Sequence, residues 1–116
     1  RIYRYLLEYA KDKNPISPET GETTLMLAAR QENEKLLRFI INEQKLDINA
    51  QDDWGQTALF LNLNEHSEKN RYIKIVKLLI ESGIDTSIKD NEGKTAYQYS
   101  LDEGYIDLAN AIRDAE

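Results

Sequence analysis

The chain has 116 residues, 41% of them hydrophobic and 31% charged, and a formal net charge of −6. It contains no cysteine, which excludes disulfides and thiolate metal sites. No apolar run approaches a membrane span, and an acidic chain repels phosphate backbones, so we expect neither a membrane nor a nucleic acid as partner.

The N-terminal residues 2–10 read as a helix with one apolar face. Pro15 and Pro18 then end this helix, and residues 18–21 form a turn. The sequence begins with Arg1 rather than methionine, so we expect its N-terminal side to be cut from a longer protein.

Three similar stretches follow, each opening with a glycine and a threonine: GETTLMLAA from Gly21, GQTALFLNL from Gly55 and GKTAYQYSL from Gly93. Their spacing is close to the roughly 33-residue period of one class of repeat. Each stretch predicts a turn and a short apolar helix, and Thr23 is placed to cap the first of these helices. A second helix is predicted after each, from LLRFIINEQKLDINAQD, IVKLLIESGIDTSIKD and IDLANAIRDAE.

This combination resembles the ankyrin repeat, in which a turn and two antiparallel helices stack on their neighbours. The resemblance implies an all-α solenoid of helix-turn-helix units joined by β-turns or hairpins. It makes residues 1–116 one domain, with a part-repeat at 1–17 and repeats at about 18–51, 52–89 and 90–116. The polar outer face of the last predicted helix is typical of a repeat that ends a stack.

The sequence departs from the ankyrin pattern in two ways. The middle unit has extra residues within 64–74, a polar segment that we expect to be a loop on one edge of the stack. All three units also lack the Thr-Pro-Leu-His sequence that commonly opens the first ankyrin helix. Without that proline and histidine we expect a stack of lower stability than an idealised one.

Catalytic signals are absent from the sequence. The one histidine, His66, has no second ligand near it, and no phosphate-binding loop or nucleophile elbow occurs. We therefore expect no enzyme activity, no metal and no cofactor. The absence of cysteine and of a signal-peptide pattern fits a cytoplasmic or other intracellular location.

Ankyrin proteins mostly bind other proteins through turn tips and the groove-facing ends of first helices. The resemblance carries this role to Glu19, Thr20, Glu22, Arg30, Gln31, Asp53, Trp54, Gln56, Asn64, Glu65, Asn91, Glu92, Lys94, Asp102 and Glu103. Seven of these are acids and two are bases, which favours a basic partner. The acids could equally be a solvated face, and Trp54 could pack on the neighbouring turn rather than bind.

The interpretation that follows is a non-catalytic, monomeric module that binds a basic segment of another protein. The alternative is a regulatory or scaffold domain of a larger protein that contacts its own neighbouring domain.

Overall fold

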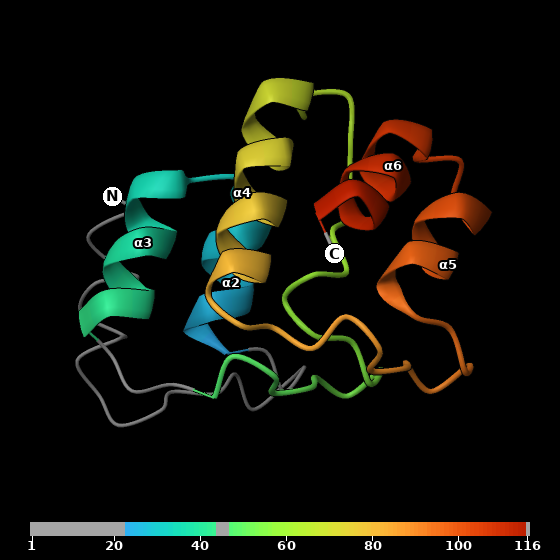
Figure 1. The fold of residues 1–116 in the computed structure, drawn as a ribbon, viewed down its shortest axis with the longest axis horizontal. Helices are drawn as coiled ribbons and strands as arrows, with labels where there is room; N and C mark the ends of the chain where they lie inside the picture. Colours follow the sequence, from blue (N-terminus) through green and yellow to red (C-terminus); the bar gives the residue numbers. More distant parts are fainter. Residues whose placement is uncertain (1–22, 44–46, 116) are drawn as a thin grey trace.

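The computed structural model describes residues 23–43 and 47–115, so the predicted N-terminal helix and Glu19, Thr20 and Glu22 lie outside the described residues. Within the described ranges the chain forms helices and no strand, which confirms the all-α prediction. The helices are α2 (Thr24–Arg30), α3 (Glu34–Glu43), α4 (Lys69–Glu81), α5 (Ala96–Asp102) and α6 (Ile106–Ala115) (Figure 1).

A threonine caps the N-terminus of α2 and of α5, the first helices of the first and last repeats. The Thr23 hydroxyl accepts a hydrogen bond from the Met26 backbone N–H at 3.2 Å, as the sequence predicts. Thr95 caps α5 in the same way, and the Gln98 side chain returns a bond to the Thr95 N–H. These bonds satisfy backbone groups that a helix N-terminus leaves without a partner.

The middle repeat differs, because residues 57–64 form no helix and the prediction of one there is wrong. A single turn closes from the Phe60 N–H to the Thr57 carbonyl at 3.1 Å and is not continued. Two groups of the following segment bond to the next repeat instead: the Asn62 amide oxygen accepts from the Tyr99 hydroxyl, and the Leu63 carbonyl from the Tyr105 hydroxyl.

The insertion is only partly the loop that its composition predicts. The chain is irregular from residue 61 to 68, but residues 69–74 form the first half of α4. Tyr72 in this half is 7% exposed, and Arg71 donates to the His66 carbonyl at 2.7 Å. The second half of the insertion is therefore helical and packed on the core. The helix starts at Lys69, within the predicted loop, and Tyr72 lies on its buried face.

The core follows the line of second helices. The helix α4 packs against both α3 and α6, while α2 packs on α3 and α5 on α6. Residues 57–64 supply four consecutive buried residues, from Ala58 to Leu61, where the middle repeat lacks its first helix. The last repeat buries Leu108, Ala109 and Ile112 completely. Of the four polar residues predicted to be exposed on its last helix, Asp107, Arg113 and Asp114 are exposed and Asn110 is half-buried. Ile106 is 53% exposed.

Two turns with the same design connect the repeats. In each, a buried aspartate, Asp52 or Asp90, accepts the N–H of the glycine three residues later through its own carbonyl, at 2.9 and 3.0 Å. Gly55 and Gly93 both have a φ of 80°, a conformation that side chains disfavour. Only Gly55 is also crowded, since a Cβ there would stand 2.8 Å from the Asn91 nitrogen.

This difference between two glycines of equal φ yields a stability prediction. We expect Gly93→Ala to cost about 1–2 kcal/mol through backbone strain alone. Gly55→Ala should cost at least about 1 kcal/mol more, because the backbone of Asn91 has to move away. Urea denaturation of both variants measures the difference. Equal losses of unfolding free energy would show that a Cβ at position 55 meets no steric hindrance from Asn91.

Candidate functional site

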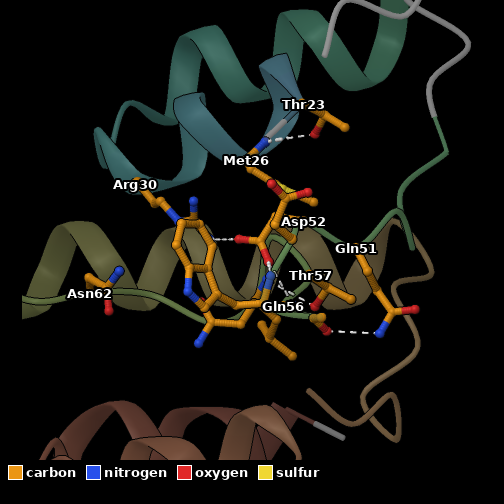
Figure 2. Close-up of polar contacts among 12 residues, drawn as sticks. Thr23, Met26, Arg30, Gln51, Asp52, Gln56, Thr57 and Asn62 are labelled. Atoms are coloured by element: carbon orange, nitrogen blue, oxygen red, sulfur yellow. Dashed lines mark hydrogen bonds and ion pairs between the residues drawn. The ribbon is translucent and has the colours of Figure 1, made fainter. Parts of the chain in front are cut away.

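The turn at residues 52–56 is built around the Asp52 carboxylate, whose side chain is 1% exposed. Its Oδ1 accepts the backbone N–H groups of Trp54 and Gln56, both at 2.9 Å. Its Oδ2 accepts from the Arg30 guanidinium at 3.2 Å, so one carboxylate joins α2 to the turn of the following repeat (Figure 2). Arg30, a predicted binding residue, is thus half-buried and held by an ion pair.

The next turn, at residues 90–94, is fastened to this one. Asp90 accepts the N–H groups of Glu92 and Lys94, each at 2.9 Å. Asn91 then donates its backbone N–H to the Trp54 carbonyl at 2.9 Å and its side-chain amide to the Asp53 carbonyl at 2.8 Å. The two turns therefore hold each other in fixed register.

Gln51 strengthens the same junction from the other side. Its amide donates to the Gly55 carbonyl at 2.8 Å, a bond drawn in Figure 2, and to the Lys89 carbonyl at 3.2 Å. We call the exposed part of the two turns, formed by Asp53, Trp54, Asn91 and Glu92, the tip surface.

Trp54 is the most exposed large hydrophobic residue of the tip surface, at 56%. Its backbone is fixed on both sides, through the N–H by Asp52 and through the carbonyl by Asn91. The prediction that this tryptophan lies outside the core is confirmed by its exposure. An exposed indole on an immobile backbone loses little entropy on binding.

Lys94 joins the tip surface to the C-terminal end of α5. Its ammonium lies 2.9 Å from Asp102 and 3.6 Å from Glu92, and these two carboxylates raise its pKa, Asp102 most strongly. Glu103 follows as an exposed carboxylate. Asp53, Glu92, Asp102 and Glu103 carry four negative charges, against the positive charges of Lys94 and of Lys89, which precedes the second turn.

Tyr99 lies among several of the predicted residues. Burial raises the pKa of its hydroxyl, as do the charges of Glu103 and Tyr105, while Arg30 and the Gln56 amide act in the opposite direction. Its ring packs at a tilt on Phe60, with centroids 5.6 Å apart, and its hydroxyl donates to Asn62. Tyr99 thus brings Arg30, Gln56 and Glu103, from three repeats, around one side chain.

The remaining predicted residues lie apart. Asn64 and Glu65 are exposed in the loop before α4, where Asn64 accepts from the His66 N–H at 2.7 Å. Gln31 is exposed at the end of α2 and lines a hollow with Arg71. Across the described residues, no hydrogen bond or ion pair connects these three to the tip surface.

Sequence reasoning did not identify Asp52, Asn62, Tyr99 and Tyr105 as parts of this site. Asp52 has a usable signal, because it stands at the same place as Asp90 in the two DxxG turns. Asn62 has a weaker one, since it occupies the position of a small helical residue, Ala28, in the first repeat. The two tyrosines carry no signal, as their partners are distant in sequence.

No group of three or more histidine, aspartate or glutamate side chains in the described ranges is placed to hold a metal ion. Within the same ranges, no helix is long and apolar enough to cross a membrane.

Comparison with known proteins identifies what the chain resembles. A family model described as ankyrin repeats in three copies matches residues 1–90. A protein of Plasmodium falciparum (isolate 3D7) that bears the name of an E3 ubiquitin-protein ligase is 38% identical over 76 residues, or 62% of this chain. Alpha-latroinsectotoxin-Lt1a of Latrodectus tredecimguttatus is 31% identical over 88 residues, or 76% of this chain.

This chain spans only 1% and 6% of the length of these two relatives. Among solved structures, the ankyrin repeat protein EF0377 superposes with a TM-score of 0.71 at 35% identity. That match covers 83% of this chain and 48% of the other.

The Arg30–Asp52 pair yields a prediction with an internal control, Asp90. In Asp52→Asn and in Asp90→Asn the amide oxygen still accepts the turn N–H groups, but only Asp52→Asn leaves a half-buried guanidinium facing an amide. We expect Asp90→Asn to cost about 1 kcal/mol and Asp52→Asn about 2 kcal/mol or more. Chemical denaturation gives the unfolding free energy of both variants, in the natural background and in a background that carries Arg30→Met. If Asp52→Asn costs the same unfolding free energy in both backgrounds, the ion pair does not contribute to stability.

Proposed function

Because this chain belongs to the ankyrin-repeat family, whose repeats are general protein–protein interaction modules, we propose that it binds a basic segment of another protein through the tip surface. The family is generally non-catalytic, and we propose the same of this chain. The module acts as a monomer, with Trp54 at the centre of the contact and acidic side chains around it.

The observation that carries this proposal is the fixed exposure of Trp54. Trp54 is 56% exposed, and two hydrogen bonds fix the backbone from which its indole projects. Tryptophan is among the residues that contribute most to binding when a partner covers them. Its rigid backbone means that the partner meets a surface that is already formed.

The sign of the charge around Trp54 selects the partner. Asp53 precedes it in the same turn, and Glu92 stands in the turn that Asn91 fastens to it. Asp102 and Glu103 extend the negative charge toward the end of α5, and Lys94 offsets part of it. A segment rich in lysine or arginine gains from these carboxylates, whereas an acidic segment is repelled.

Binding of short peptides tests the proposal directly. We would display sets of peptides matched in length and aromatic content but differing in net charge, and probe them with the labelled domain. The proposal requires that basic peptides bind and that their acidic counterparts do not. Equal binding by both sets would remove charge as the basis of recognition.

Trp54→Ala should weaken binding of the best basic peptide by about 2 kcal/mol, or roughly thirtyfold, mainly through faster dissociation. Phe39→Ala is the matched control, because Phe39 is also an exposed aromatic residue, at 41%, but lies on α3. Surface plasmon resonance separates the two rates. An affinity unaffected by Trp54→Ala, with an unchanged melting curve, would move the binding site away from the tip surface and favour a contact made elsewhere on the domain.

Asp53→Asn combined with Glu92→Gln should slow association and flatten its dependence on salt, since charges at the edge of an interface steer the encounter. Glu68→Gln with Glu81→Gln changes the charge by the same amount at the two ends of α4 and should leave both properties nearly unchanged. Stopped-flow association at a series of salt concentrations gives the comparison. Equal effects of the two double variants would mean that only net charge matters.

A further inference from the structure

A second surface lies between α4 and α6, away from the tip surface. The two helices pack against each other and lie next to each other in Figure 1. Between them runs a groove of about 490 Å³, within the usual size range of binding pockets. It is lined by Lys69, Ile73, Lys77, Asp107, Asn110, Ala111, Asp114 and Ala115, and we call it the α4–α6 groove.

The groove extends along both helices, because it is lined by three positions of α4 and five of α6. On α4 its lining residues recur every four positions, with Ile73 between two lysines, and on α6 Ala111 and Ala115 recur in the same way. Residues four apart lie on one side of a helix, so each wall is a continuous row. The side chains of Ala111 and Ala115 are small and half-buried, so they leave space above them. Together with Ile73 they form the apolar floor of the groove. A groove between two helices with an apolar floor accepts a row of side chains from a third helix.

A second hollow, between the α2–α3 loop with the first residues of α3 on one side and α4 on the other, provides a comparison. Its lining is polar throughout: Gln31, Glu32, Asn33, Glu34, Lys35, Arg71 and Lys74. Arg71 lies 3.4 Å from Glu32 there, so the hollow is bridged by an ion pair. The α4–α6 groove differs from this hollow in that Ile73, Ala111 and Ala115 are among its lining residues.

The walls of the α4–α6 groove carry opposite charges. The α4 wall presents Lys69 and Lys77, and the α6 wall presents Asp107 and Asp114. At one end Lys69 and Asp107 approach to 3.7 Å. At the other end Lys77 and Asp114 are both exposed, and among the described residues no ion pair joins them; the ion pair of Asp114 is with its neighbour Arg113, at 3.4 Å. This open end offers a positive and a negative group to an incoming segment.

We propose that the α4–α6 groove docks an amphipathic helix of a partner protein, with its acidic edge on α4 and its basic edge on α6. The apolar stripe of that helix covers Ile73, Ala111 and Ala115. Turning a helix end for end exchanges its two edges, so the opposite charges of the walls also fix the direction of the bound helix. This surface goes beyond the tip surface, because it lies on other elements and selects a different chemistry.

Three designed peptides test the charge selection. Each is a helix of about 18 residues with the same stripe of leucines. The edges carry glutamate and lysine in the first peptide, glutamate on both sides in the second, and lysine on both sides in the third. Fluorescence anisotropy should show the mixed peptide binding roughly threefold to tenfold tighter than either of the others. Methyl NMR signals of Ile73 and Ala111 should shift on binding.

Two substitutions on α4 make the test specific. Lys77→Glu makes both sides of the open end acidic, while Lys69 stays paired with Asp107 at the other end, and it should shift the preference toward the lysine peptide. Lys74→Glu changes the same charge on the same helix but lines the other groove, so it should keep the preference for the mixed peptide. Ala111→Leu fills the floor and should weaken all three peptides about tenfold, with its melting curve showing that it folds. Trp54→Ala should change none of these affinities.

Several outcomes would overturn the proposal. Equal binding by the three peptides would remove the charge selection. The same response to Lys74→Glu as to Lys77→Glu would reduce it to an effect of net charge. Absence of methyl shifts at Ile73 and Ala111 would place any binding elsewhere. Shifts at these methyls that follow protein concentration without peptide would assign the groove to a second copy of the chain.

Discussion

The Asp52 carboxylate is the contact on which the connection between repeats depends. It fixes the turn through two backbone N–H groups and receives the Arg30 guanidinium from the preceding repeat. Because the turn is fixed, the Trp54 carbonyl stands where Asn91 of the following repeat donates to it. One buried negative charge thus coordinates three repeats, and its desolvation is compensated by every bond that it accepts.

The binding surface follows from this arrangement rather than from a pocket. The same hydrogen bonds that stabilise the turn also hold the tryptophan in place, so the scaffold and the site are not separable at this position. The substitutions that test recognition are therefore side-chain changes at Trp54, Asp53 and Glu92, whereas changes at Asp52 or Gly55 test the scaffold. This division follows from burial: Asp52 is buried, and the other three side chains are exposed.

The repeat period was enough to predict the fold, because glycine and threonine recur at positions where backbone geometry demands them. Thr23 and Thr95 cap helices as their sequence context indicates. Thr57 has the same context and begins no helix, because the outcome depends on Tyr99 and Tyr105, which bond to Asn62 and Leu63 from the next repeat. A local pattern cannot contain that information.

The candidate site divides in the same way. The exposure of Trp54 could be predicted, since the period alone places it at a turn tip. The ion pair of Arg30 could not, because it depends on which buried group the guanidinium meets across the repeat boundary. The start of α4 was missed for a related reason: the charged residues around Tyr72 look like a loop until the helix buries that one ring.

The missing helix of the middle repeat affects how the stack comes apart. In a solenoid, stability is a sum of the intrinsic stability of each repeat and the coupling between neighbours. A repeat that keeps one helix, and whose other half is fixed by two hydroxyl groups of the following repeat, has weak intrinsic stability and strong coupling. When the last repeat unfolds, Asn62 and Leu63 lose their hydrogen-bond partners. The intrinsic stability of the middle repeat is then too low to keep it folded. We therefore expect the C-terminal repeat and the middle repeat to unfold as one cooperative unit rather than one repeat at a time.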